Sequence, residues 1–340
     1  MKAALIGLSQ SGKSTLLSAI SGKEIGAGGG VSIEQAVVAV PDERLDWLTD
    51  LYKPKKTTPA TIDCVDVPGF NFGDDHGRAA AKKLIGQIRT VDLLVFVVRD
   101  FENPAVACYG DRVDAGGDLE ELKTELLLAD LELVTTRIEK LEKQIHKPTK
   151  TQVQDKAELS LQQKLQETIE AEKPISEAVK NDSEMAIIKS LGFMTLKPII
   201  VAVNVDESKV GEKVDLSGVI GDKVPVIEIC STLERELSQL DEGSRGEFMA
   251  DMGIGESAVS KFVNGCYSAL GLISFLTTGA DEVRAWPILE GTTALDAAGK
   301  VHSDIKRGFI RAETIAYNDL VEYGSEKAVK AAGKMRLEGK

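Results

Sequence analysis

The chain has few of the residues that build metal centres or disulfide frameworks. Its 340 residues include only four cysteines and three histidines. The cysteines show no C-x-x-C spacing, and the histidines are too dispersed to form a cluster. This pattern argues against a zinc site and against a disulfide-stabilised secreted domain. We therefore expect buried thiols in a reducing compartment, and a cytoplasmic location. The residues concerned are Cys64, Cys108, Cys230, Cys266, His76, His146 and His302.

The sequence also lacks a long apolar run and an excess of basic residues. No segment reaches the roughly 20 apolar residues that a membrane-spanning helix needs, and the first residues resemble a strand rather than a signal peptide. The formal net charge is −13, from 41 Lys and Arg against 54 Asp and Glu. Nucleic-acid surfaces need clustered Lys and Arg, so a surface devoted wholly to nucleic acid is disfavoured. We expect no membrane association and a monomeric protein.

What the sequence does contain is a phosphate-binding loop. The stretch "KAALIGLSQSGKSTLLSAISG" (2–22) includes the pattern G-x-x-x-x-G-K-[ST] between Gly7 and Ser14. Such a loop turns backbone N–H groups toward a phosphate, and the following helix adds the positive end of its dipole. Lys13 can reach the β- and γ-phosphates, and the Ser14 hydroxyl can bind Mg²⁺. We predict nucleotide contacts from Gly7, Ser9, Gln10, Ser11, Gly12, Lys13, Ser14 and Thr15.

A second motif, "DCVDVPGF", has the arrangement D-x-x-G. Asp66 ends a predicted strand and Gly69 follows three residues later. An aspartate in this position can hold a Mg²⁺-bound water, and the glycine N–H can sense a γ-phosphate. We therefore predict Asp66 as a metal ligand and Gly69, with Lys13, as part of the catalytic set.

A third motif, "VAVNVDE", ends another predicted strand. In GTP-binding proteins this position reads N-K-x-D, and its aspartate binds guanine. Here Val205 replaces the lysine, and Glu207 is one methylene longer than the aspartate. This difference from the N-K-x-D motif disfavours guanine as the bound base, but it does not by itself show that the base is adenine. The segment "EICSTLE" would supply a loop beneath the base. The predicted contacts are Asn204, Val205, Glu207, Ser231, Thr232 and Leu233.

Five apolar segments alternate with helical patterns along the chain. They cover residues 3–8, 61–67, 92–100, 198–204 and 225–230. This alternation predicts an α/β fold, a P-loop domain of the G type with a mostly parallel sheet and helices on both faces. We assign residues 1–118 and 196–271 to this domain.

The segment from 119 to 195 interrupts the α/β pattern. Apolar residues repeat at spacings of four and three from Leu127 to Ile145, and Pro148 then breaks the helix. A second helix is predicted around 156–180. We therefore expect an inserted α-helical coiled-coil hairpin.

The C-terminal segment from 272 to 340 predicts a small α+β domain. "LISFLTTG" and "EVRAWPIL" resemble paired strands around a turn at 279–281, and "SEKAVKAAGKMRLEGK" resembles a helix with a basic end.

Over nearly its whole length the chain resembles the Obg-like ATPases of the YchF type, a family of translation-factor-related P-loop NTPases with a C-terminal TGS domain. The resemblance is carried by "VPDERLDWLTDLYKPKK", "TIDCVDVPGF", "TELLLADLE", "NVDE", "FVNGCYSALGLISFLTTGADEVRAW" and "RGFIRAETIAYNDLVEYGSEKAVKAAGKMRLEGK". It implies a preference for ATP with Mg²⁺, slow hydrolysis, and association with the ribosome or another large ribonucleoprotein, or a role in stress regulation.

The chain departs from that family at several points. Ser32 stands where a switch threonine is expected, and its hydroxyl would still suit Mg²⁺. Phe70 replaces the glutamine that orients water in GTPases and is included in the catalytic set as an apolar substitute. "NPAVACYG" (103–110) lacks the histidine common in the family, and His76 is a substitute or a solvated residue. The chain ends at "RLEGK", where the TGS domain would continue into a last strand.

These features predict a slow ATPase that acts as a regulatory switch. Two alternatives stay open: a GTPase of the same class, and a nucleotide-binding scaffold with little or no hydrolysis. An ABC-type ATPase is disfavoured because the chain has no L-S-G-G-Q signature.

Overall fold

The structure, a computed structural model, describes residues 1–23, 33–148, 150–252 and 254–339. The chain forms two compact units, one of residues 1–38 with 63–269 and one of residues 39–62 with 270–340. Among the described residues, none of the helices combines the length and apolar character needed to cross a membrane. All four cysteines are free; three are buried and Cys108 is half-buried.

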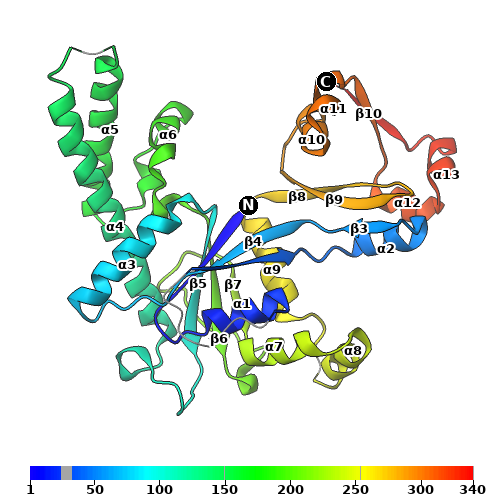
Figure 1. The fold of residues 1–340 in the computed structure, drawn as a ribbon, viewed down its shortest axis with the longest axis horizontal. Helices are drawn as coiled ribbons and strands as arrows, with labels where there is room; N and C mark the ends of the chain where they lie inside the picture. Colours follow the sequence, from blue (N-terminus) through cyan, green and yellow to red (C-terminus); the bar gives the residue numbers. More distant parts are fainter. Residues whose placement is uncertain (24–32, 149, 253, 340) are drawn as a thin grey trace. The chain divides into compact units, whose positions relative to one another are not determined.

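The first unit is built on a six-stranded sheet with the order β2-β4-β1-β5-β6-β7 (Figure 1). β1 pairs in parallel with β4 and β5, β5 with β6, and β6 with β7. This confirms the α/β fold with a mostly parallel sheet. The strands are β1 (Lys2–Ile6), β2 (Glu34–Ala39), β4 (Thr61–Asp66), β5 (Leu93–Asp100), β6 (Ile199–Val205) and β7 (Val226–Ile229).

Helices cover both faces of this sheet. Alternate β5 residues such as Leu94 and Phe96 share a core with Leu122 of the long helix α4. On the opposite face Gly265 of α9 lies against Ile200 of β6, because successive strand residues point to opposite sides. The helices of the unit outside the inserted segment are α1 (Lys13–Ser21), α3 (Asp75–Gln87), α7 (Ser231–Gln239), α8 (Glu242–Asp251) and α9 (Ala258–Ala269).

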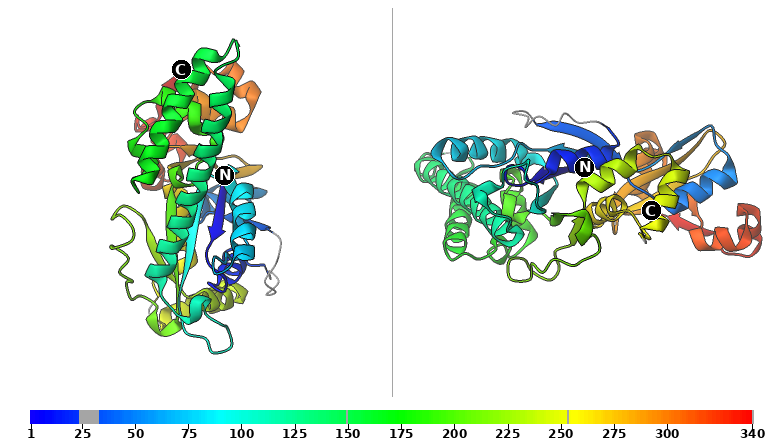
Figure 2. Two further views of the ribbon diagram at one scale, coloured as in Figure 1. Left: turned by 90° about the vertical axis from the view of Figure 1, so that its left-hand side faces the viewer. Right: turned by 90° about the horizontal axis from the view of Figure 1, so that it is seen from below.

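The inserted segment contains the expected hairpin of helices, α4 (Ala115–Gln144) and α5 (Gln152–Glu170). Figure 2 shows the two helices side by side. The prediction of one helix to residue 180 is wrong, because α5 ends at Glu170 and Glu172 adopts φ 57°. A 3₁₀ turn (Ile175–Glu177) and a short helix α6 (Asp182–Ile188) follow. The seam residues Val134, Ile138, Leu161, Leu165 and Ile169 are buried together.

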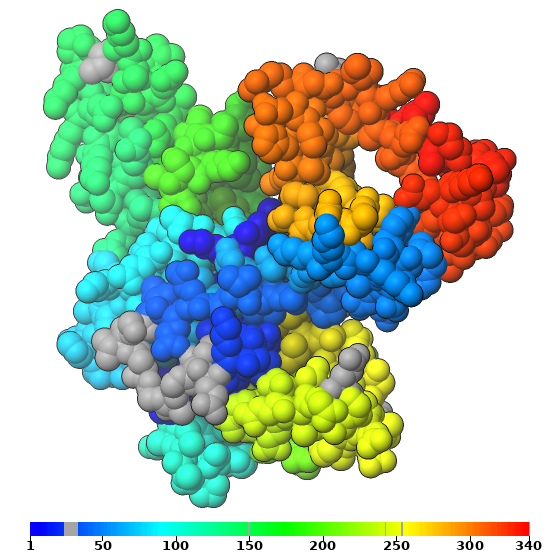
Figure 3. Space-filling view, turned by 45° about the vertical axis from the view of Figure 1, so that its right-hand side comes forward, coloured from blue at the N-terminus to red at the C-terminus, as the bar shows by residue number. Residues whose placement is uncertain are grey.

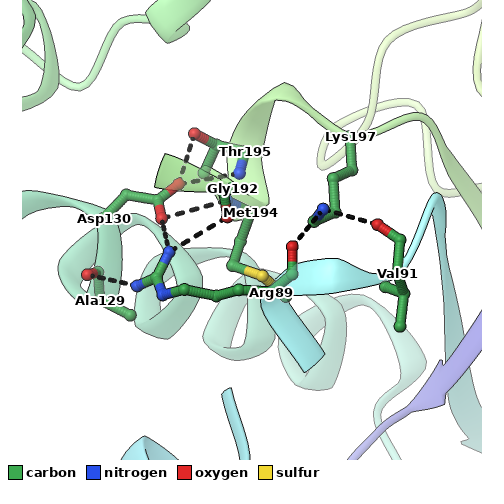
Figure 4. Close-up of polar contacts among 8 residues, drawn as sticks. All are labelled: Arg89, Val91, Ala129, Asp130, Gly192, Met194, Thr195 and Lys197. Atoms are coloured by element: carbon green, nitrogen blue, oxygen red, sulfur yellow. Dashed lines mark hydrogen bonds and ion pairs between the residues drawn. The ribbon is translucent and has the colours of Figure 1, made fainter. Parts of the chain in front are cut away.

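A buried polar cluster joins α4 to the sheet (Figure 4). Asp130 of α4 has no exposed surface. Its carboxylate accepts hydrogen bonds from Arg89 Nη1 (2.8 Å), Met194 N (3.1 Å), and Thr195 N and Oγ1 (both 2.9 Å). Lys197 Nζ donates to the main-chain oxygen of Arg89 at 2.9 Å. One carboxylate therefore binds α4 to the segments that precede β5 and β6.

The second unit contains a three-stranded sheet, β3-β9-β8, and a two-stranded sheet, β10-β11. The expected pairing of 272–279 with 282–289 is confirmed, since β8 and β9 are antiparallel. Residues 39–62, which the sequence analysis placed with the nucleotide-binding segments, belong to this unit: β3 pairs with β9, and Trp47 packs edge-on against Tyr317. Figure 3 shows α2 and β3 in blue beside the yellow-orange strands β8 and β9.

The prediction that the chain closes as one helix is wrong. α13 ends at Ala331, Gly333 adopts φ 70°, and β11 pairs antiparallel with β10. A left-handed glycine ends a helix at little steric cost. The elements of the unit are α2 (Glu43–Tyr52), β3 (Lys56–Thr58), β8 (Leu272–Thr277), β9 (Glu282–Leu289), α10 (Ala294–Val301), α11 (Ser303–Gly308), β10 (Arg311–Thr314), α12 (Tyr317–Tyr323), α13 (Glu326–Ala331) and β11 (Arg336–Gly339).

We predict that Asp130→Ala lowers the free energy of unfolding by about 3 kcal/mol, because it removes a fully buried carboxylate and leaves the half-buried Arg89 and the main-chain N–H groups of Met194 and Thr195 without their partner. Urea unfolding followed by circular dichroism measures the change. Glu132→Ala is the matched control: Glu132 is half-exposed and pairs with Lys82, so its loss should cost less than about 1 kcal/mol. Equal effects of the two substitutions would contradict the role assigned to Asp130.

Candidate phosphate-binding site

The phosphate loop connects β1 to α1, and its conformation requires two of its glycines. Gly12 adopts φ 93°, and a Cβ on it would lie 2.1 Å from Asn204 Nδ2. A Cβ on Gly7 would lie 2.3 Å from the main-chain oxygen of Val97. Gly12 is also the N-cap of α1, with no side chain capping the helix. The first N–H groups of α1 are therefore not taken by a side-chain cap, which is the arrangement that binds anions.

Lys13 is folded into the loop. It is 5% exposed, and its Nζ donates to the main-chain oxygens of Gly7 (3.2 Å) and Leu8 (3.0 Å) and to Ser11 Oγ (3.4 Å). Burial lowers the pKa of Lys13 to about 8, an effect that the nearby charge of Asp66 partly opposes. The loop therefore encloses an amine that favours a nearby anion.

Ser14 and Asp66 form a site that fits a hard cation. Ser14 Oγ donates to Asp66 Oδ2 at 2.6 Å, while the buried Asp66 Oδ1 has no hydrogen-bond partner among the residues that the structure describes. Burial raises the pKa of Asp66, while the Ser14 hydrogen bond and Lys13 lower it and Glu34 raises it. A buried carboxylate oxygen without a partner, beside a hydroxyl, matches the ligands of Mg²⁺. In the described part of the chain no group of three or more His, Cys, Asp or Glu side chains could hold a metal, and Mg²⁺ often has only one or two carboxylate ligands.

The D-x-x-G segment is bound to the loop through its backbone. Phe70 N donates to the Gly7 oxygen, and Ser9 N donates to the Phe70 oxygen, both at 3.0 Å. A Cβ on Gly69 would lie 2.7 Å from Ser9 Cα. The Phe70 ring is 1% exposed and packs against Phe72 in the core. Of the predicted catalytic residues, Phe70 can therefore act only through its backbone.

Asn204 connects the loop to the third motif. Its Nδ2 donates to the Ser11 oxygen at 3.1 Å, and its Oδ1 accepts from Ser231 N at 3.0 Å. Both polar atoms of the side chain are therefore bound within the protein. Asn204 holds the loop and the start of α7 in place.

The remaining predicted residues lie in different environments. Val205 and Leu233 are buried in the hydrophobic core, so their side chains do not face an open site. Glu207 and Thr232 are exposed, and Thr15 is half-buried on α1. Ser32 lies outside the described residues. The hydrogen bonds and close approaches above link the loop with Asp66, Gly69, Asn204 and Ser231.

Arg99 is a further residue of the site that was not predicted from the sequence; it is 3% exposed near the end of β5. Its guanidinium contacts the phosphate loop at the main-chain oxygen of Gln10. The only signal in the sequence was a basic residue at the end of the apolar strand "LLVFVVRD".

Comparisons with known proteins agree with the fold and the motifs. Residues 272–340 match the family model YchF-GTPase_C, described as a protein of unknown function (DUF933), and residues 2–175 match MMR_HSR1, described as 50S ribosome-binding GTPase. The chain is 36% identical to Ribosome-binding ATPase YchF of Bacillus subtilis, over 100% of this chain and 95% of that protein.

Further relatives extend over the same length. Obg-like ATPase 1 of Oryza sativa subsp. indica is 34% identical over 100% of this chain and 88% of that protein. The solved structure of the Schizosaccharomyces pombe YchF GTPase matches with a TM-score of 0.85 and 32% identity, over 100% of this chain and 94% of that chain.

We predict that Lys13→Met stabilises the ligand-free protein. The folded-state pKa of about 8 lies below the ordinary 10.5, so the unfolded chain binds the proton more tightly. This penalty is fully present below pH 8 and is lost as the pH rises from 8 to 10.5. The substitution should raise the free energy of unfolding at pH 7 by about 2 kcal/mol, and the wild type should approach it at higher pH.

Urea unfolding at pH 7 and pH 10 measures this difference. Lys23→Met is the control, since Lys23 is exposed and its loss should change stability by less than about 0.5 kcal/mol. A Lys13→Met protein no more stable than the wild type at pH 7 would show that the buried amine carries no penalty.

Proposed function

The chain belongs to the YchF family of Obg-like ATPases, and on that basis we propose that it binds Mg-ATP and hydrolyses it slowly to ADP and phosphate. The observation that supports this most directly is the pair formed by Ser14 and Asp66, 2.6 Å apart beside the uncapped start of α1. It combines a cation site and an anion site, as a metal–phosphate ligand requires.

Each group of the site has a proposed role. Residues Gly7 to Thr15 surround the phosphates, and Lys13 exchanges its bonds to the loop oxygens for the β- and γ-phosphates. Ser14 and Asp66 hold Mg²⁺, with Ser32 proposed as a further ligand. When bound, the ion neutralises charge on the phosphate oxygens. The backbone N–H of Gly69 is the proposed sensor of the γ-phosphate.

Recognition of the base is proposed to rest on Glu207, the backbone at Val205, and Ser231 to Leu233. Asn204 is bound to Ser11 and Ser231, so its side chain supports the loops rather than reading the base. The lysine of a guanine site is absent, and curated relatives are named ATPases, which favours ATP. GTP is the second candidate, because the Schizosaccharomyces pombe relative is called a GTPase.

The side chains close to the proposed position of the γ-phosphate favour slow hydrolysis. Phe70 is buried and apolar, so its side chain cannot orient a water molecule. His76 is exposed in the first turn of α3. A site whose described residues offer no positioned water-orienting side chain is better suited to a switch than to rapid catalysis, and a scaffold with little hydrolysis is the limiting case.

A route from the site to the helical hairpin supports the switch role. Phe72 N, three residues after Gly69 of the D-x-x-G segment, donates to Tyr109 Oη at 3.2 Å, and Tyr109 Oη donates to Glu121 Oε1 of α4 at 2.9 Å. Arg78 of α3 also pairs with Glu125 of α4 at 2.8 Å. A shift of the D-x-x-G segment on nucleotide binding would therefore act on α4.

We predict by calorimetry that the wild type binds ATP more tightly than GTP, and that binding weakens when Mg²⁺ is removed. Lys13→Ala should abolish measurable binding, because it removes the charge that meets the phosphates. Asp66→Asn should lose the Mg²⁺ dependence and keep weaker, metal-independent binding. Phosphate release should stay below about 1 per second, slower than typical enzymes.

The outcomes separate the alternatives. Tighter GTP binding would identify a GTPase, and ATP binding without phosphate release would identify a scaffold. Absence of binding to either nucleotide at millimolar Mg²⁺ would refute the proposal as a whole. Lys23→Ala, an exposed lysine just after α1, is the matched control and should bind like the wild type.

We further propose that the protein acts as a cytoplasmic monomer that associates with the ribosome or another large ribonucleoprotein. The names of the curated relatives support this partner. We predict that the wild type co-sediments with ribosomes through a sucrose cushion several-fold more with ATP than without, because bound nucleotide would shift the D-x-x-G segment and so act on α4. In Lys13→Ala, ATP should no longer increase co-sedimentation, whereas in Lys23→Ala it should increase it as in the wild type. If the amount of co-sedimented protein is the same with and without ATP in all three proteins, a nucleotide-dependent association is excluded.

A further inference from the structure

Arg99 is a buried cation beneath the phosphate loop. It is 3% exposed and lies directly beside Asn204 in the parallel register of β5 and β6. Its guanidinium lies 4.3 Å from the centre of the Phe101 ring. Its hydrogen bonds to the described residues go to main-chain oxygens: Phe101 (3.1 Å), Val106 (3.2 Å), Ala107 (3.2 Å) and Gln10 (3.4 Å).

Within the described ranges of the chain, this cation has no carboxylate partner. Over the part of the chain that the structure describes, Arg99 takes part in hydrogen bonds to neutral oxygens and in no ion pair. The neighbouring Asp100 pairs instead with Lys209 at 3.0 Å. A buried charge is costly unless an opposite charge compensates it, and carbonyl dipoles do so only in part. The nearest feature built to hold an anion is the phosphate loop that Arg99 itself contacts.

Arg99 and Asn204 hold two consecutive carbonyl groups of the loop. Arg99 Nη1 donates to the Gln10 oxygen at 3.4 Å, and Asn204 Nδ2 donates to the Ser11 oxygen at 3.1 Å. Because a trans peptide is planar, fixing a carbonyl also fixes the N–H of the next residue on the opposite side. Gln10 adopts φ 66°, which is unfavourable for a residue with a side chain. The loop conformation is therefore held from the sheet.

We propose that Arg99 is a positioning residue for the phosphate loop, and that its buried positive charge is compensated by the phosphates of the bound nucleotide. The proposal rests on the nucleotide binding proposed above. Arg99 acts through the Gln10–Ser11 peptide and through its charge, without touching the nucleotide. Arg99 also donates hydrogen bonds to both ends of the loop from Phe101 to Ala107. The same side chain therefore binds this loop and the phosphate loop.

Two substitutions separate the geometric role of Arg99 from its charge. Arg99→Lys keeps the charge but loses the planar fork of donors, and it should weaken ATP binding about tenfold. Arg99→Gln keeps neutral donors but removes the charge. Because the charge acts more strongly on the more highly charged ligand, Arg99→Gln should weaken ATP binding more than ADP binding. The ratio of the ATP and ADP affinities should therefore fall in Arg99→Gln and stay near the wild-type ratio in Arg99→Lys.

Calorimetry with Mg-ATP and Mg-ADP measures these affinities, and thermal unfolding without ligand verifies that each variant folds. Arg89→Lys is the matched control, an equivalent change at another arginine bound to carbonyl oxygens, in the cluster around Asp130. It should lower stability and leave both affinities within about twofold of the wild type.

The results distinguish this inference from the proposed function. A wild type that binds no nucleotide refutes the function itself. A wild type that binds ATP, with Arg99→Lys binding as tightly, overturns the positioning role. Equal weakening of ATP and ADP in Arg99→Gln overturns the charge role. If Arg99→Gln does not fold, the comparison of Arg99→Lys with Arg89→Lys still tests the positioning role, since equal ATP affinity in the two would refute that role.

Discussion

The parallel register of the central strands is the constraint on which the site depends. Leu5 of β1 lies beside Asp66 of β4, and Arg99 of β5 lies beside Asn204 of β6. Because the carboxyl ends of parallel strands meet at one edge of a sheet, residues far apart in the sequence are delivered to the same loop. A shift of one residue in any of these pairs would point the polar side chain at the opposite face. The apolar strand interiors, packed on both faces, hold that register.

The ligand-free site contains polar groups that the protein does not fully satisfy. Asp66 Oδ1 is buried without a partner, Lys13 is bonded to uncharged oxygens, and Arg99 has no counter-ion in the described chain. Each group nevertheless has hydrogen bonds within the protein: Asp66 Oδ2 accepts from Ser14, and Lys13 and Arg99 donate to main-chain oxygens. Arrangements of this kind concentrate at binding sites, where a ligand completes them.

The sequence predicted the parts of the site that are short contiguous motifs. It did not predict the contacts between residues that lie far apart in the chain. The loop from Gly7 to Ser14 and the D-x-x-G segment are short motifs whose spacing reflects local geometry, so they could be identified directly. Arg99 and Tyr109 could not, since their roles depend on oxygens and amides distant in sequence. Strand β2 was missed because an apolar residue, Val37, stands at an exposed position at the sheet edge, so that the sequence shows no alternation of apolar and polar residues. The C-terminal helix was extended too far because a glycine in the left-handed region ends it without a proline as a signal.

The long helix α4 is bound to the rest of the unit near its middle, at Asp130. The helix runs unbroken from Ala115 to Gln144, which at 1.5 Å per residue is a rod of about 45 Å. Asp130 fixes it close to its midpoint, and Glu121 receives the bond from Tyr109 on one side of that point. A stiff rod pivoting near its centre moves its two ends in opposite directions by equal amounts. The half of α4 before Asp130 also packs on the sheet through Leu119, Leu122 and Leu126, so a tilt of about 5° that carried the helix with it would displace the far turn by ~2 Å.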